Sequence, residues 1–159
     1  MSKEAPVHFV QIELERDYPM LCKWWSGHKA NPPAKIILPR GWVAAGSGLP
    51  IAACFLYVAE GKIAVIEYMT TNPQVAHSRE LWITVCALYD YLEKVAKDEG
   101  CQAIISFVKP NSSEQRIMVR MGYATSDDDP GHKLYGKPLQ NQEKWTPPAD
   151  GVIKCPSPS

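Results

Sequence analysis

The feature that most constrains the fold of this chain is an amphipathic segment from residue 79 to residue 99. Its apolar residues recur at steps of three and four, which places them on one face of an α-helix. They are Leu81, Val85, Leu88, Leu92 and Val95, with Trp82, Cys86 and Tyr89 beside them. Ser78 is a suitable N-cap and Gly100 a suitable C′ residue. The pattern therefore predicts one long helix with a stop signal at each end.

The chain before this helix has the alternation of apolar and polar residues that is typical of β-strands. The expected strands are 7–13, 41–45, 51–59 and 63–71. Gly46-Ser47-Gly48 and Glu60-Gly61-Lys62 are suited to tight connections between the last three strands. We therefore predict an antiparallel meander that leads into the long helix.

A shorter helix is expected between the first two strands. Asp17 is a suitable N-cap, Pro19 suits a first turn, and Gly27 marks the end. Trp24 and Trp25 are adjacent in this helix. Because adjacent helical side chains point about 100° apart, we expect at most one of the two to face the core fully.

The chain after the long helix contains three further elements. Residues 101–108 form a nearly uninterrupted apolar run, which predicts a strand covered on both faces after a helical crossover. Asn111, Ser112 and Ser113 are suited to start a second helix that reaches Met121 and is closed by Gly122. A hairpin of residues 123–125 and 133–135 is expected to follow. Five prolines and few apolar residues follow from about 137. We predict one domain over 1–136 and a Pro-rich, flexible tail over 137–159.

Composition excludes several classes of function. Lys plus Arg and Asp plus Glu both total 17, so no net charge attracts nucleic acid or anionic membranes. The N-terminus lacks the apolar core of a signal peptide, and no segment reaches the roughly 18 apolar residues of a membrane helix. We therefore expect a cytoplasmic protein.

The cysteines and histidines do not predict a metal site. Five scattered cysteines with no C-x-x-C pair argue against a disulfide framework and a zinc site. Cys54 and Cys86 lie in apolar runs, where cysteine acts as a small core residue. The histidines have no second ligand at metal spacing, so no metal is expected.

One segment resembles a known family. Asn111-x-x-x-x-x-Ile117-Met118-x-x-x-Gly122-Tyr123 is similar in spacing to Asn-x-x-Ala-x-x-Leu-Tyr-x-x-x-Gly-Phe of the GNAT superfamily, the acetyl-CoA-dependent N-acetyltransferases. The order of predicted elements over residues 7–136 also resembles that family, as in a divergent member. The resemblance implies an α/β (α+β) fold with a mixed, mostly antiparallel central sheet, a splayed strand pair and flanking helices.

The resemblance also implies acetyl-CoA as the cofactor. Its predicted binding residues are Met69, Thr70, Thr71, Gln74, His77, Ser78, Arg79 and Asn111. The strand 63–71 would offer backbone groups to the pantetheine arm, and the start of the long helix would hold the pyrophosphate. The loop 72–80 contains no glycine, whereas the family pattern has Gly-x-Gly or Gly-x-Ala there. Ser78 and Glu80 can equally serve only as helix caps.

The resemblance places the catalytic residues less completely. Glu67 lies in an apolar strand, near where family members place a general base, although simple alternation can equally point it to solvent. The tyrosine that serves as general acid in the family corresponds to Met118, and a thioether cannot donate a proton. Tyr123 and Tyr135 are other phenols, for which we favour core packing.

Predicted substrate residues come from the first helix and the loop after it. They are Trp24, Trp25 and His28, with Lys35 and Arg40 as further candidates. The first hypothesis is transfer of an acetyl group to a small-molecule amine or a protein amino group. The second is an inactive GNAT-like protein-interaction module. The third is an unrelated α+β domain, which a splayed parallel strand pair at Met69 and Ser106 would exclude. A homodimer is compatible with each hypothesis.

Overall fold

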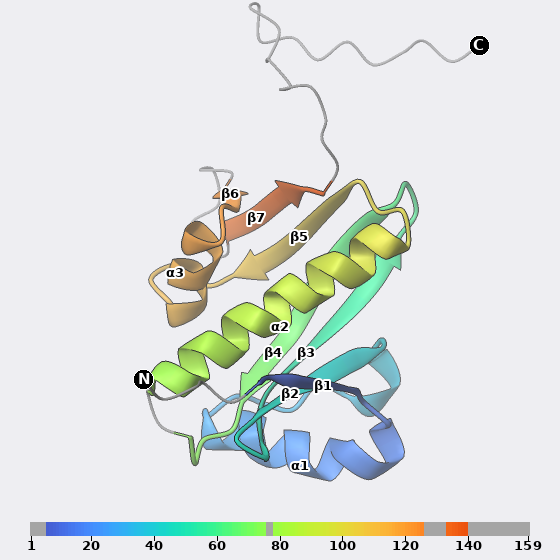
Figure 1. Cartoon of the computed structure of the whole chain (residues 1–159). Helices are drawn as coiled ribbons and strands as arrows, with labels where there is room; N and C mark the ends of the chain where they lie inside the picture. Colours follow the sequence, from blue (N-terminus) through green and yellow to red (C-terminus); the bar gives the residue numbers. More distant parts are fainter. Residues whose placement is uncertain (1–5, 76–77, 126–132, 140–159) are drawn as a thin grey trace, which may run out of the picture.

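The computed structural model describes residues 6–75, 78–125 and 133–139. In chain order the elements are β1 (His8–Gln11), α1 (Leu14–Gly27), the 3-10 helix η1 (Lys35–Ile37), β2 (Gly41–Gly46), β3 (Leu49–Ala59), β4 (Ile63–Thr71), α2 (Arg79–Asp98), β5 (Ala103–Val108), α3 (Ser113–Arg120), β6 (Ala124–Thr125) and β7 (Lys133–Pro138). The order of strands and helices predicted from the sequence is confirmed (Figure 1).

The strands form one mixed sheet in the order β1-β2-β3-β4-β5-β7-β6. Every neighbouring pair is antiparallel except β4 and β5, which are parallel. Helix α2 makes the crossover between them, as parallel neighbours require. The predicted class, a mostly antiparallel mixed sheet with flanking helices, is confirmed.

The parallel strands separate after a short paired stretch. Their ladder runs from Ile63 opposite Ala103 to Ile66 opposite Ser106. Beyond Ile66, β4 continues beside β3, and β5 continues beside β7. The splayed pair expected of a GNAT fold is therefore present, with its last ladder pair at Ile66 rather than Met69. The hypothesis of an unrelated α+β domain required that pair to be absent.

A β-bulge lies where β4 leaves β5. Tyr68 and Met69 together oppose Cys54 of β3, since Glu67 pairs with Phe55 and Thr70 with Ala53. Tyr68 has a φ of 56°, a left-handed conformation that is uncommon for a bulky residue. Bulges bend a strand and redirect its side chains. This bulge therefore sets the direction of the last residues of β4.

Alternate residues of β3 enter two cores on opposite faces of the sheet. Cys54 and Leu56 belong to the core that contains α2 and α3, whereas Ala53 and Phe55 belong to the core under α1. Figure 1 shows α2 lying across the sheet, with α3 beside β5 and β7. Each fully buried Leu or Phe contributes about 1.5–3 kcal/mol, so both helices are held by burial of their apolar faces.

The caps of α2 and α3 agree with the sequence. The Ser78 hydroxyl accepts the Leu81 N–H at 3.1 Å, and the Ser112 hydroxyl accepts the Gln115 N–H at 3.1 Å. Gly100 and Gly122 follow the helix ends with φ near 80°, a conformation in which glycine avoids the Cβ clash. Among the described residues, no helix is long and apolar enough to cross a membrane.

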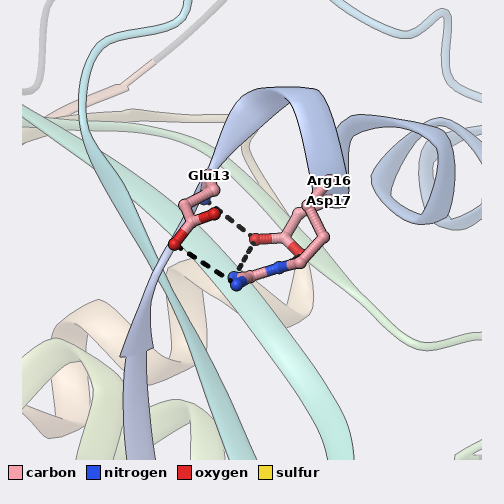
Figure 2. A network of polar contacts seen from close by, with 3 residues as sticks. All are labelled: Glu13, Arg16 and Asp17. Atoms are coloured by element: carbon pink, nitrogen blue, oxygen red, sulfur yellow. Dashed lines mark hydrogen bonds and ion pairs between the residues drawn. The ribbon is translucent and has the colours of Figure 1, made fainter.

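Helix α1 begins earlier than predicted. Glu13, not Asp17, is its N-cap, and Asp17 lies inside the first turn. The Asp17 carboxylate accepts the backbone N–H of Glu13 at 2.9 Å and two bonds from the Arg16 guanidinium at 2.8 Å (Figure 2). A side chain in the first turn that reaches back to the N-cap N–H resembles half of a capping box. Asp17 therefore does cap α1, but it does so from inside the first turn, by accepting the N–H of the preceding N-cap residue Glu13.

Two further details differ from the predictions. Phe107 of β5 is 51% exposed, so this strand is not covered on both faces. β7 runs to Pro138 and Leu139 is buried, so ordered structure passes the boundary drawn at residue 136. Residues 140–159, which hold most of the predicted tail, lie outside the described residues.

Candidate functional site

A cavity of about 860 Å³ lies beside the point where β4 leaves β5. Its lining comes from the end of α1, the end of β4 with the loop after it, one face of α2, and the first turns of α3. A cavity of this volume is in the range that holds a small molecule or cofactor. The splayed strands therefore open beside a space large enough for a ligand.

The last residues of β4 line this cavity. Met69, Thr70 and Thr71, three of the predicted cofactor residues, all contribute to the wall. Thr70 is only 4% exposed, and its hydroxyl has no hydrogen-bond partner among the described residues. A buried hydroxyl without a partner costs about 1–3 kcal/mol. The hydroxyl oxygen has almost no accessible surface, so this unsatisfied group is buried behind the cavity wall.

The end of α1 is attached to the end of β4. The His28 Nε2 lies 2.9 Å from the Thr71 carbonyl oxygen and 3.0 Å from its hydroxyl. Since a carbonyl can only accept, the first bond requires the proton on Nε2. His28, a predicted substrate residue, lines the cavity. Its contact with Thr71 therefore joins α1, where the substrate residues were predicted, to β4, where cofactor residues were predicted.

Close packing reinforces that attachment. A Cβ on Gly27, the last residue of α1, would stand 2.4 Å from Cγ of Pro73. Asn72 anchors the same loop to β3, because its side-chain amide donates to the Pro50 carbonyl at 3.0 Å and its backbone N–H to the Ile51 carbonyl at 2.8 Å. The loop after β4 is therefore fixed from two sides as it enters the cavity wall.

The N-terminus of α2 also reaches the cavity. Ser78 lines it and caps the helix, so the positive end of the helix dipole lies at the wall. The Glu80 carboxylate lies toward β2, with its Oε1 3.0 Å from where a Cβ on Gly46 would stand. Glu80 is not among the residues that line the cavity. Its negative charge is therefore directed away from the space expected to receive a diphosphate.

Three other predicted cofactor residues do not line the cavity. Gln74, Arg79 and Asn111 are exposed and absent from its lining. The Gln74 backbone N–H donates to the Asn72 side chain at 3.0 Å, and that of Asn111 donates to the Gln115 side chain. His77 lies outside the described residues. Their roles toward a cofactor stay predictions.

Two polar side chains that the sequence did not mark as a pair also line the cavity. The Tyr89 hydroxyl of α2 donates to the Glu114 carboxylate of α3 at 2.8 Å, and both residues are part of the cavity wall. Burial raises the pKa of the Glu114 carboxyl, and the bond from Tyr89 opposes part of that rise. Burial also raises the pKa of Tyr89 well above its usual value, so this phenol stays protonated.

One signal in the sequence marks Glu114. It stands at the fourth position of the segment that starts at Asn111, where the family pattern has alanine. The partner Tyr89 carried no signal beyond its place on the apolar face of α2. Only the packing of α2 against α3 joins the two residues.

Glu67, the predicted base, does not line the cavity. Its cross-strand partner is Phe55, whose ring is 6.3 Å from that of Trp25, so Glu67 belongs to the sheet face that α1 covers. Glu67 is half-buried. Its role as a base stays a prediction.

The residues weighed for the acid role lie in the core. Met118 is fully buried, which accounts for an apolar side chain at the family's tyrosine position. Tyr123 is buried, and its hydroxyl donates to Glu93 at 3.1 Å, while burial raises the pKa of this phenol. Tyr135 is also buried, and neither tyrosine lines the cavity. Core packing, the role we favoured for both phenols, agrees with this burial.

The tryptophan pair differs from the prediction. Both Trp24 and Trp25 are 5% exposed, although we expected at most one to face the core fully. Leu38, from the loop after α1, joins the same cluster, so α1 has apolar neighbours beyond the sheet. Trp25 lines the cavity and Trp24 does not.

The remaining candidates lie elsewhere. Lys35 pairs with Glu15, and Arg40 pairs with Glu99, so these two candidate substrate residues form ion pairs outside the cavity lining. No group of three metal-ligating side chains occurs within residues 6–75, 78–125 and 133–139. Cys54 is fully buried, and burial raises the pKa of its thiol, as expected of a core cysteine.

No protein-family model matches this sequence, and no curated protein matches it. Solved structures do match. A ribosomal-protein-S18-alanine N-acetyltransferase from Escherichia coli superposes with a TM-score of 0.66 at 12% identity, covering 87% of this chain and 97% of the other. An acetyltransferase of the GNAT family from Staphylococcus aureus gives 0.66 at 13% identity, covering 85% and 100%.

A third match was solved with a ligand. The PaiA N-acetyltransferase from Thermoplasma acidophilum, in complex with coenzyme A, superposes with a TM-score of 0.61 at 13% identity. The alignment covers 84% of this chain and 99% of that one. At such low identities the likeness establishes the fold and leaves the chemistry to be argued from the site.

Proposed function

We propose that this chain, which has the GNAT fold, is an N-acyltransferase that moves an acetyl group from acetyl-CoA to an amine. The observation that supports this most directly is the cavity beside the splayed β4 and β5, which is lined by the end of β4 and by the first turns of α2 and α3. Its volume and its mixture of apolar and polar lining residues are those of a small-molecule or cofactor site.

The residues present fit such a donor. The β5 side of Met69, Thr70 and Thr71 has no ladder partner among the described residues, so this edge is available to the amide groups of a pantetheine arm. The Ser78 end of α2 offers the positive end of its helix dipole to phosphate. Acetyl-CoA, when bound, supplies the acyl group as a reactive thioester.

The acceptor amine would enter beside Trp25 and His28. Both residues line the cavity from the α1 side, across from the α2 and α3 walls. Trp25 supplies an apolar surface, and the His28 contact with Thr71 holds the α1 wall against β4. The amine would then approach from the side opposite the phosphate end, as a direct transfer requires.

An inactive interaction module is the second candidate. The observation that favours it is the buried Met118 at the family's tyrosine position, together with the glycine-free loop 72–80. Loss of acid catalysis typically costs only about 10²–10⁴-fold, and a thiolate is a tolerable leaving group. An active enzyme without that tyrosine is therefore chemically reasonable, and we favour the enzyme.

The deciding experiment is calorimetric titration of the full chain with acetyl-CoA and with free CoA. We expect micromolar binding of both, weakened in Arg79→Ala and unchanged in Lys94→Ala, which removes a cation from the far end of α2. An acceptor screen by mass spectrometry, with an alkyl diamine, an arylamine and a peptide with a free α-amino group, would then detect the product. Absence of binding at millimolar ligand would favour the interaction module.

A further inference from the structure

We propose that Glu114 accepts the proton of the attacking amine and that Tyr89 is the positioning residue that holds its carboxylate in the cavity wall. The inference rests on the proposed N-acyltransferase function and adds a catalytic residue on α3. It differs from the sequence-based assignment, which placed the base at Glu67 on β4.

The geometry supports this role. Glu114 lies in the first turn of α3, and its carboxylate is bound by the Tyr89 hydroxyl at 2.8 Å. Tyr89 is fully buried on α2, so its phenol is held in one place by packing. Both residues line the cavity that the end of β4 also lines. A fixed acceptor of protons therefore belongs to the wall of the space where the thioester would lie.

The surroundings of Glu114 contain few charges. From α2 the titratable neighbour is Tyr89, from β3 it is the buried thiol of Cys54, and on α3 itself Arg116 lines the cavity. His28 lies on the α1 wall of the same cavity. Burial dominates and raises the pKa of the carboxyl, which brings it closer to the range that suits a base near neutral pH.

The reaction balances with these groups alone. The amine nitrogen forms a bond to the carbonyl carbon of the thioester, and the carbon–sulfur bond breaks with its electron pair on sulfur. The proton released by the nitrogen passes to the Glu114 carboxylate. Transfer of that proton to the CoA thiolate regenerates Glu114 and gives the amide and the free thiol. No oxidant, reductant or further co-reactant is needed.

The test compares two isosteric carboxylate replacements, Glu114→Gln and Glu67→Gln, by kcat and kcat/KM across pH. We expect Glu114→Gln to lose about 10²–10³-fold in kcat, within the usual range for general base catalysis, with acetyl-CoA affinity unchanged. The limb of kcat/KM that rises with pH should also disappear. If Glu67 were the base instead, Glu67→Gln would show this loss while Glu114→Gln kept the wild-type rate and profile, and that result would overturn the inference.

A second measurement needs no turnover. A carboxyl whose pKa is raised by folding binds its proton more tightly in the folded state, so the fold loses stability as pH rises from the unfolded value through the folded one. In denaturant unfolding, the free energy of unfolding of the wild type should therefore fall, relative to that of Glu114→Gln, as pH rises between the unfolded-state and folded-state pKa of Glu114. Tyr89→Phe removes a bond that favours the charged form, so it should shift both the window and the kinetic limb to higher pH.

The outcomes separate the two proposals. A wild type that neither binds acetyl-CoA nor acetylates any amine contradicts the proposed function, and the inference with it. An active wild type whose rate and pH profile survive Glu114→Gln contradicts the inference alone. A pH profile that Tyr89→Phe leaves in place would contradict the positioning role. Glu114→Asp, which restores a carboxyl, should recover part of the rate if Gln merely removed the base.

Discussion

Thr70 and Thr84 are two buried threonines that differ in one respect. Both hydroxyls lack a hydrogen-bond partner among the described residues, and the residues are 4% and 1% exposed. Thr70 lines the cavity, whereas Thr84 lies on α2 near Gly46 and is not part of the lining. Thr84 therefore serves as a matched control for Thr70. A comparison of the two separates the effect of an unsatisfied hydroxyl on stability from its effect on ligand binding.

Replacement of each threonine by the near-isosteric valine should separate stability from binding. Removal of an unpartnered buried hydroxyl should leave the free energy of unfolding unchanged or raise it by about 1 kcal/mol in both variants. Only Thr70→Val should weaken acetyl-CoA binding, by roughly three- to tenfold, since one hydrogen bond is worth about 1 kcal/mol. Calorimetric titration and urea unfolding of both variants check this. Equal affinities would mean that the Thr70 hydroxyl does not contact the ligand.

At the scale of elements, the contact between α1 and the loop after β4 controls the cavity wall. Gly27 ends α1 against Pro73, and His28 then bonds to Thr71. The proline ring cannot swing aside as a long flexible side chain would. The position of the whole α1 wall therefore depends on the absence of a side chain at residue 27.

Gly27→Ala tests that dependence. Alanine is the better helix former by about 1 kcal/mol, so an isolated α1 would gain from the change. In the folded chain the added Cβ would stand 2.4 Å from Pro73, and we expect a net loss of about 1–3 kcal/mol. Ser26→Ala, at the preceding exposed position, should cost less than about 0.5 kcal/mol. Thermal unfolding of the two variants decides. A stabilised Gly27→Ala would show that the loop moves away freely.

At the scale of the whole molecule, the cavity joins segments from both faces of the sheet. α1 packs on one face, α2 and α3 on the other, and all three reach the opening beside β4. A ligand in that space would contact elements that otherwise belong to separate cores. Binding should therefore stabilise the fold as a unit.

We expect acetyl-CoA at 100 times its dissociation constant to raise the unfolding free energy by about 2.7 kcal/mol. For a chain of this size, that corresponds to a rise in Tm of roughly 5–11 °C. Hydrogen exchange should slow at the end of β4 and the first turns of α2 and α3, and remain unchanged in the edge strand β1. Protection that is concentrated in β1 and β2 instead would place the ligand elsewhere.

Local signals in the sequence determined the elements and most of their ends. Periodicity located β3, β4 and α2, and the caps at Ser78, Ser112, Gly100 and Gly122 lie where the sequence indicated. These features depend on interactions between residues no more than about four positions apart, so the local sequence is enough to predict them. The Asp17 bond to Glu13 shows the limit, because the same residue can cap forward or backward.

Tertiary structure alone decided the site. The bulge at Tyr68 gives no sign in the sequence, since only pairing with β3 forces two residues opposite Cys54. Tyr89 and Glu114 are 25 positions apart, and only the packing of α2 and α3 on one sheet face brings them together. Burial then gives Glu114 its raised pKa, and burial is a property of the surroundings rather than of the residue. The sequence by itself determined which elements this protein has; their packing decided which side chains meet in the cavity.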